Sequence, residues 1–280
     1  MPMFRRQAFV LSLMGALAPF TAAVAEQKPL WEFGLGVGAV TFPEYRGSDE
    51  IETYPVPVPR FVYRGDFFKA DRDGVRGELF DRKYAEMSIS VSASVPVKSE
   101  DNAARRGMED LSPTLELGPS LELHVWKSSN ERYKLDVVMP FRIPVTVESS
   151  PRSIGWVVAP RVNLDIENVA GKAGWNLGLG VGPEFAARKF NQYFYSVAPR
   201  FATPTRPAYE ADGGYSGMNF VAALSKKFPN YWVGTFVSYG ALRGAAFDGS
   251  PLVRSSYSLS GGIGIAWMIR ESSTMVESDD

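Results

Sequence analysis

Few side chains in this 280-residue sequence could carry acid–base or nucleophilic chemistry. The absence of cysteine excludes a thiolate metal site and a cysteine nucleophile, and a single histidine, His124, excludes histidine-rich metal sites. A hydrolase that used His124 as its base would need a serine nucleophile, yet the nearest following serine, Ser128, lies in "KSSNER" without a nucleophile motif. Glu116 and Glu122 share one strand face but lie about 20 Å apart, too far for joint acid–base work. The sequence predicts a protein that is not an enzyme and binds no cofactor or metal.

Two glycine repeats invite comparison with a nucleotide-binding loop. Gly34, Gly36 and Gly38 form "GLGVG", and Gly178, Gly180 and Gly182 echo it. A dinucleotide fingerprint requires a helix directly behind the glycines. Proline follows each repeat and the glycines alternate with apolar residues, so the repeats indicate strands.

The first 25 residues have the features of a cleaved secretory signal peptide. Arg5 and Arg6 precede an apolar stretch that ends in the small-residue motif Ala23-Val24-Ala25, so we expect the mature chain to begin at Glu26. An uncleaved membrane anchor is the alternative interpretation, although the stretch is short for one. The mature chain has 28 basic and 31 acidic side chains, a balance that does not indicate nucleic-acid binding. No later segment reaches the 18 or so apolar residues of a membrane helix.

Alternation of apolar and small or polar residues recurs along the whole mature chain. In "EMSISVSASVPV", residues 86–97, methionine, isoleucine and valine fall on one face while glutamate and serines fall on the other. Several such segments are long enough to cross a bilayer as tilted strands. Twelve strands are predicted, the weakest being 54–64, 67–80, 193–200, 217–228 and 231–242; the others are 31–41, 86–97, 114–126, 133–145, 154–166, 175–185 and 257–269.

Two all-β architectures fit this alternation. A secreted sandwich would bury the apolar face and expose the polar face to water. An outer-membrane barrel would instead turn the apolar face to lipid and the polar face to a lumen. Strand length, the even strand count, aromatic residues near strand ends and a second face of glycine, serine and isolated charges favour an antiparallel transmembrane barrel of about 12 strands.

Several motifs resemble the MipA/OmpV family, named for the MltA-interacting protein, over essentially the whole mature chain. They are "GLGVGAVTFPEYRGSDE", "YPVPVPRFVYRGDFF", "RGMEDLSPTLELGPSL", "RPAY" and "SPLVRSSYSLSGGIGIAW". The resemblance implies a Gram-negative outer-membrane barrel with lipid and the barrel-assembly machinery as partners. For the namesake it also implies a scaffold between a murein hydrolase and a murein synthase, whereas other relatives are described as porins, adhesins or immunogens.

The inward positions of a barrel would place charge on one wall and glycine on the opposite wall. Strands one and twelve must pair, and their inward face is nearly bare; we call its members Gly34, Gly36, Gly38, Gly262 and Gly264 the glycine seam. Mixed-sign side chains on strands five to seven are expected to reach toward this seam and neutralise one another, which would leave a narrow or closed pore. These lumen charges are Glu116, Glu122, Lys134, Asp136, Arg142, Arg161 and Asp165, and His124 is expected in the lumen or at the membrane interface.

Orientation follows if the N-terminus starts in the periplasm. Residues 42–52, 201–216 and 243–255 would then face outward, while residues 98–112 would face the periplasm. A surface of Arg105, Arg106, Glu109 and Asp110 could dock a periplasmic murein hydrolase or synthase; a solvated loop without a partner is the alternative.

The last strand carries the features that the assembly machinery reads, with Gly264, Trp267 and Ile269 as the expected signal. An acidic tail, residues 270–280, follows the barrel of residues 26–269 and is expected in the periplasm. The sequence thus predicts a non-catalytic scaffold for envelope proteins that process murein. A small-solute porin and a surface adhesin acting through the outer loops are the alternatives.

Overall fold

The computed structural model describes residues 27–64, 68–71, 74–77, 80–82, 84–130 and 132–277. The predicted signal peptide and residues 278–280 of the predicted tail lie outside this part of the chain. Within the described residues, no helix combines the length and apolar character needed to span a membrane.

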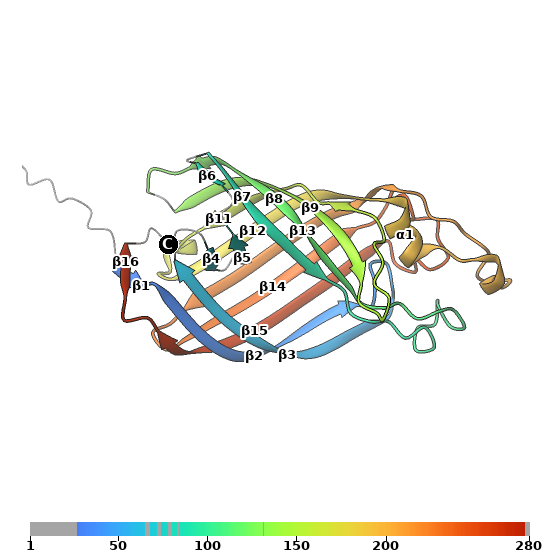
Figure 1. Ribbon diagram of the computed structural model, residues 1–280, viewed down its shortest axis with the longest axis horizontal. Helices are drawn as coiled ribbons and strands as arrows, with labels where there is room; N and C mark the ends of the chain where they lie inside the picture. The colour runs from blue at the N-terminus through green and yellow to red at the C-terminus, as the bar shows by residue number, and fades with distance from the viewer. Residues whose placement is uncertain are drawn as a thin grey trace, which may run out of the picture.

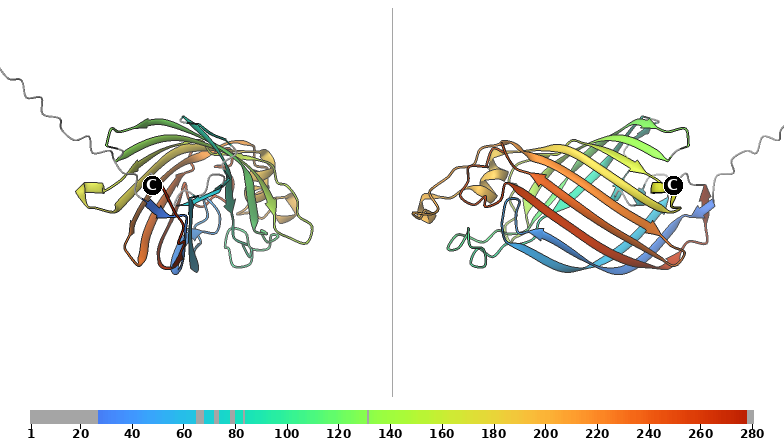
Figure 2. Two further views of the ribbon diagram at one scale, coloured as in Figure 1. Left: turned by 60° about the vertical axis from the view of Figure 1, so that its left-hand side comes forward. Right: turned by 180° about the vertical axis from the view of Figure 1, so that it is seen from behind.

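Long antiparallel strands form one main sheet that curls into a barrel (Figures 1 and 2). The sheet runs in the order β5-β4-β3-β2-β15-β14-β13-β12-β10-β9-β8-β7-β6, and β11 continues β10 between β12 and β9. The first and last long strands, β2 and β15, pair with each other, as predicted. The strands are β2 (Trp31–Pro43), β3 (Ile51–Arg64), β4 (Phe68–Asp71), β5 (Gly74–Gly77), β6 (Phe80–Arg82), β7 (Ala85–Ala93), β8 (Thr114–Lys127), β9 (Tyr133–Thr146), β10 (Val157–Val158), β11 (Arg161–Ile166), β12 (Trp175–Ala186), β13 (Gly214–Lys227), β14 (Tyr231–Ala241) and β15 (Tyr257–Glu271).

The two faces of each strand have opposite surroundings. On β2, Val37 is 62% exposed on the outside whereas Glu32 is only 2% exposed on the inside. On β7, Ile89 and Val91 are exposed while Ser88 is buried. A water-soluble sandwich would bury the apolar side chains, so this reversal identifies the outer face as the one that meets lipid. The predicted antiparallel transmembrane barrel is confirmed, and the sandwich is excluded.

Two predicted strands are wrong in detail. Residues 193–200 form no strand: helix α1 (Arg188–Tyr195) and the short 3-10 helix η2 (Pro199–Phe201) occupy this region, and β12 pairs directly with β13. The predicted strand 67–80 instead contains β4 and β5, which pair with each other as a hairpin. The hairpin adds one reversal of the chain that the sequence pattern did not reveal.

That extra reversal changes the end of the barrel at which the next loop lies. The short turns after β8, β11 and β13 lie at the end that also holds the first and last described strands, β1 (Gln27–Pro29) and β16 (Met275–Glu277), which we call the terminus end (Figure 1). The longer connections gather at the opposite end, and residues 98–112 are among them, not at the terminus end as predicted. Because outer-membrane barrels have short periplasmic turns and longer extracellular loops, the long-loop end is the outer end. The five connections at the outer end are residues 44–50, 94–113, 147–156, 187–213 and 242–256, and all but 44–50 are longer than the turns at the opposite end.

A separate two-stranded ladder joins the ends of the described chain. Strand β1 (Gln27–Pro29) pairs antiparallel with β16 (Met275–Glu277) beside the terminus end of the barrel. Part of the predicted acidic tail is therefore structured, since β15 extends to Glu271 and β16 follows it.

Candidate functional site

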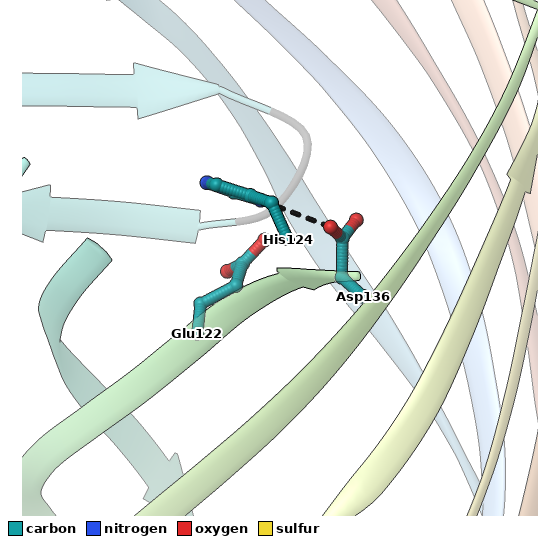
Figure 3. Close-up of side chains that lie close together, drawn as sticks. All are labelled: Glu122, His124 and Asp136. Atoms are coloured by element: carbon teal, nitrogen blue, oxygen red, sulfur yellow. Dashed lines mark hydrogen bonds and ion pairs between the residues drawn. The ribbon is translucent and has the colours of Figure 1, made fainter. Parts of the chain in front are cut away.

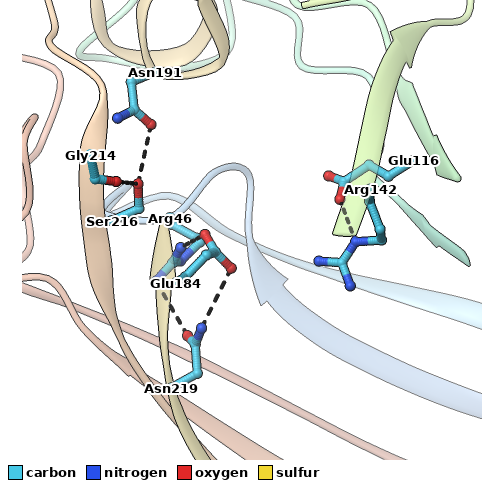
Figure 4. Close-up of polar contacts among 8 residues, drawn as sticks. All are labelled: Arg46, Glu116, Arg142, Glu184, Asn191, Gly214, Ser216 and Asn219. Atoms are coloured by element: carbon cyan, nitrogen blue, oxygen red, sulfur yellow. Dashed lines mark hydrogen bonds and ion pairs between the residues drawn. The ribbon is translucent and has the colours of Figure 1, made fainter. Parts of the chain in front are cut away.

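The best-defined lumenal ion pair joins two adjacent strands. Arg142 of β9 donates from Nε to Oε2 of Glu116 of β8 at 2.9 Å (Figure 4). Both side chains are largely buried, and Arg142 also contacts the Ser90 hydroxyl at 3.5 Å. A buried carboxylate and guanidinium require a partner of opposite charge, and each supplies it to the other.

Three more predicted lumen residues converge near the periplasmic end. His124 lies opposite Asp136 in the β8–β9 register, with Nδ1 at 2.9 Å from Oδ1 of Asp136. Glu122 lies on the same wall, and its carboxylate approaches the pair (Figure 3). One donor atom from each of the three residues lies within 4.8 Å of the other two. This cluster combines an imidazole with two carboxylates, a set the sequence-based exclusion of histidine-rich sites did not consider.

Lys134, another predicted lumen charge, has a partner on its own wall. Lys134 Nζ lies 3.5 Å from Oε1 of Glu167, and Asp165 faces Lys134 in the β9–β11 register. Arg161 and Asp165 both make polar contacts as well. Lys134 and Glu167 thus neutralise each other locally.

The expectation that these charges reach the glycine seam is wrong, because apolar side chains lie over it. Val58 approaches Gly38 and Gly264, and Phe236 approaches Gly262. The seam has a different physical cause at Gly36, where an added Cβ would lie 1.7 Å from the carbonyl oxygen of Ile265. Glycine is therefore needed there because the β2 and β15 backbones approach closely.

Two ion pairs bridge the lumen, and the sequence pattern predicted neither of them. Arg46, just beyond β2, forms an ion pair with Glu184 of β12 and donates to Oδ1 of Asn219 at 3.2 Å (Figure 4). At the other end, Lys227 of β13 lies 2.5 Å from the buried carboxylate of Glu32 on β2. The signal available in the sequence was a lone charge at an inward strand position, as in "VGPEF" for Glu184.

The long connections at the outer end pack into one structure, which we call the cap: residues 44–50, 94–113, 147–156, 187–213 and 242–256. Each of the five contributes to a common hydrophobic core. Tyr195 stacks on Phe247 with ring centroids 3.7 Å apart, and the Tyr45 hydroxyl donates to the carbonyl of Leu252 at 2.8 Å. The buried members are Tyr45, Val97, Ala104, Leu111, Ile154, Phe194, Tyr195, Val197, Ala211, Leu242, Ala245, Phe247 and Leu252.

Hydrogen bonds link cap segments that arise from different parts of the barrel wall. Arg105 is only 3% exposed and donates from Nη1 to the carbonyl of Phe194 at 3.1 Å. Asn102 donates to the Glu44 carboxylate at 2.6 Å, and Arg206 donates to the carbonyl of Ala104 at 3.0 Å. These contacts hold the loops of β2–β3, β7–β8 and β12–β13 together across the mouth of the barrel.

The proposed periplasmic docking surface is therefore at the wrong end of the barrel, and one of its four members is buried. Arg105 is buried, and Asp110 accepts the backbone N–H of Ser99 at 2.7 Å. Arg106, Glu109 and Asp110 are exposed; Glu109 pairs with Arg200 at 2.6 Å, and Arg106 Nε donates to the carbonyl of Glu100 at 3.4 Å. These residues stabilise the cap at the outer end because their loop folds onto its neighbours.

Burial inside the cap shifts the pKa values of its ionisable side chains. Desolvation raises the pKa of the Tyr45 hydroxyl to about 12 and also raises the pKa of Tyr195. Desolvation likewise lowers the pKa of the Arg105 guanidinium, opposed by the nearby Tyr45 and Tyr193 rings. The cap core thus keeps its phenols neutral at physiological pH.

Residues 35–269 match the family described as MltA-interacting protein MipA. The chain belongs to this family. The family expected from the sequence motifs is thus confirmed, and with the lipid-facing barrel it identifies the chain as an outer-membrane protein.

Three solved bacterial structures match this MipA-family chain at low sequence identity and low TM-score. The Pseudomonas aeruginosa outer membrane protein OprG is 8% identical with a TM-score of 0.24, covering 86% of this chain and 94% of its own. The Ralstonia pickettii toluene transporter TbuX is 10% identical with a TM-score of 0.23, covering 89% and 71%. The Pseudomonas putida toluene transporter TodX is 12% identical with a TM-score of 0.27, covering 88% and 68%. No curated protein matches the sequence.

The expected assembly signal lies on the last strand of this MipA-family barrel. Trp267 and Ile269 point outward and are about half exposed, while Gly264 faces Gly38 across the seam. Ile269 coincides with an irregularity in the β15–β2 ladder between Met268 and Arg270. The strand continues past the predicted terminal residue to Glu271.

The serine considered as a nucleophile has a local structural role. The Ser128 hydroxyl donates to Oδ1 of Asn130 at 2.7 Å and accepts the backbone N–H of Tyr133 at 3.1 Å. Both bonds close the β8–β9 turn.

Proposed function

We propose that this MipA-family chain is a non-catalytic outer-membrane barrel that is closed at its outer end and serves as a platform for murein-processing proteins. The observation that carries the proposal is the cap, in which five connections share one hydrophobic core across the mouth. A passage for solutes would have to open this core, and burial of apolar surface at about 25 cal/mol per Å² opposes that.

The lumen below the cap supports the same conclusion. The Arg46–Glu184–Asn219 group crosses the lumen directly beneath the cap. Selective channels usually line their constriction with charge of one sign. Here opposite charges pair with each other, which favours a rigid support over a conducting path.

The partner surface belongs at the terminus end, since murein enzymes act in the periplasm. The family description names an interaction with MltA, and the murein-processing partner is proposed on that basis. The short turns 128–132, 167–174 and 228–230 lie there together with the β1–β16 ladder. Lys172 is exposed in one of these turns, whereas Lys98 is exposed in the cap.

Conductance of the refolded mature protein in a planar bilayer tests the closed lumen. We expect a silent but inserted barrel, and Phe247→Ala should introduce openings because it removes a central side chain of the cap core. Stable ion-selective steps in the unaltered protein would favour the small-solute porin instead.

Site-specific photo-crosslinking in cells tests the partner side. A photoreactive residue at position 172 should capture a murein-processing protein, whereas the same residue at position 98 should not. Capture at position 98 alone would place the partner at the cell surface and contradict the periplasmic platform.

A surface-binding role is the second candidate, favoured by the ordered cap at the outer end. Under this reading, intact cells that display the protein would bind a host or abiotic surface, and Phe247→Ala would abolish that binding. The proposed assembly signal of Gly264, Trp267 and Ile269 applies to either function, and Trp267→Ser should lower the amount of assembled barrel in the membrane.

A further inference from the structure

One cluster of metal-ligating side chains lies on the lumen wall, away from the cap. Glu122 and His124 occupy alternate positions of β8, and Asp136 faces His124 from β9 (Figure 3). We propose that Glu122, His124 and Asp136 form a binding site for a divalent transition-metal ion of the zinc class.

The strand geometry brings the three ligands together. Residues two apart on a strand project from the same face, and the residue opposite one of them adds a third group from the adjacent strand. His124 Nδ1 and Asp136 Oδ1 already lie 2.9 Å apart, close to the separation of two ligands on one ion. The Glu122 carboxylate completes the set, since its donor atom lies within 4.8 Å of the other two.

The donor set selects the class of ion. Imidazole suits zinc, copper, nickel and iron, whereas magnesium and calcium prefer sites made of oxygen alone. Two carboxylates balance the charge of a divalent ion, and three protein ligands leave a further position for water. His124 is the only histidine of the chain, so a histidine-dependent site in one protomer can form only here.

A further carboxylate lies beside the cluster. Glu86 lies opposite Glu122 in the β7–β8 register and is itself buried. Lys134, a cation on the adjacent strand, contacts Glu167.

Isothermal titration calorimetry of the refolded full-length mature protein with zinc chloride tests the site. We expect saturable binding of about one ion per chain. His124→Ala and Asp136→Asn should each weaken binding by about tenfold or more, because loss of even an outer-sphere partner typically costs 10–100-fold. Glu167→Gln is the matched control: it removes a carboxylate at the same end of the barrel, and its affinity should equal that of the parent.

Three outcomes would overturn the proposal. They are the absence of saturable zinc binding by a folded barrel, equal affinity in His124→Ala, and equally strong binding of magnesium, which would indicate a general acidic surface. Folding of each variant is checked independently by the heat-dependent gel shift of the barrel. The result does not depend on whether the barrel conducts or recruits a partner.

Discussion

The barrel wall and the cap bury opposite kinds of side chain, although one chain builds both. In the wall, Ile263 is 67% exposed on the outside while Glu116 is buried on the inside. In the cap, Phe247 is 1% exposed and charged groups such as Arg200 and Glu109 pair at the surface. The wall meets lipid and the cap meets water, so the same physical rule produces an inverted pattern in one region and the ordinary globular pattern in the other.

The stability of the two regions should therefore respond differently to the same kind of change. The wall is stabilised by a continuous ladder of backbone hydrogen bonds. Close packing of side chains on its lipid-facing side adds little stability. The cap has few strands and depends on its core. Mutations that probe packing should act on the cap, and mutations that probe lipid compatibility should act on the wall.

Phe247→Ala should have the largest effect and should confine it to the cap. Removing a fully buried aromatic side chain typically costs about 3–5 kcal/mol, and Phe247 also stacks on Tyr195. Hydrogen exchange should increase in residues 187–213 and 242–256 while β13 and β14 stay protected. Simultaneous loss of protection in the strands would mean that cap and wall unfold as one unit.

Ile263→Arg should destabilise the wall by about 2–4 kcal/mol, because it places a charge near the middle of a lipid-facing strand. Denaturant unfolding of the barrel from liposomes measures this change. Ser150→Arg, at an exposed position in the cap, should change the free energy of unfolding by less than about 0.5 kcal/mol. Similar costs at both positions would contradict the assignment of the outer face to lipid.

A double-mutant cycle of Glu116→Gln and Arg142→Met should give a coupling energy of about 1–3 kcal/mol. Each single change leaves the other member of a buried pair without its charge partner, and the double change removes both charges. Unfolding of all four proteins in liposomes supplies the cycle. Strict additivity would show that the two groups are separately solvated in a wet lumen.

Alkaline pH should loosen the cap, with a smaller effect of roughly 1 kcal/mol per pH unit. Burial raises the pKa of Tyr45 from 10.0 to about 12, so stability from its neutral phenol is present below pH 10 and is lost as the pH rises through about 12. Tyr45→Phe should flatten this pH dependence, although loss of the bond to Leu252 costs about 1 kcal/mol at neutral pH. Near-UV circular dichroism of the cap follows both effects.

Tyr84→Phe is the control for the alkaline experiment, because Tyr84 is 67% exposed and lies outside the cap. It should leave the pH dependence of the cap unchanged. An identical shift in this variant would mean that the alkaline effect does not arise in the cap core.

Much of the wall could be predicted because a strand between lipid and lumen alternates apolar residues, which face lipid, with small or polar residues, which face the lumen. The pairing of β2 with β15 and the lumenal positions of Glu116 and Arg142 followed from that period of two. The cap could not be predicted in this way. Its core draws one to four residues from each of five connections, such as Tyr45, Ala104 and Phe247, and no local period relates them.

The strand count shows how local errors spread. The β4–β5 hairpin is only four residues on each side, too short to leave an alternating pattern, and one unrecognised reversal moved residues 98–112 to the wrong end. The strand predicted at residues 193–200 is wrong because a pattern was present but tertiary packing overrode it. Its aromatic residues satisfy a strand pattern, but packing of Phe194 and Tyr195 against the cap core selects a helix.

The sequence by itself determined the family, the transmembrane barrel and the side of each long strand that faces lipid, because those properties are repeated in every strand. Only the tertiary structure decided which charges meet. Arg46 with Glu184, Lys227 with Glu32, and the Glu122, His124 and Asp136 cluster join residues through the curvature and register of the sheet. Such contacts depend on where strands lie in space, and the alternation along any one strand contains no information about its distant neighbours.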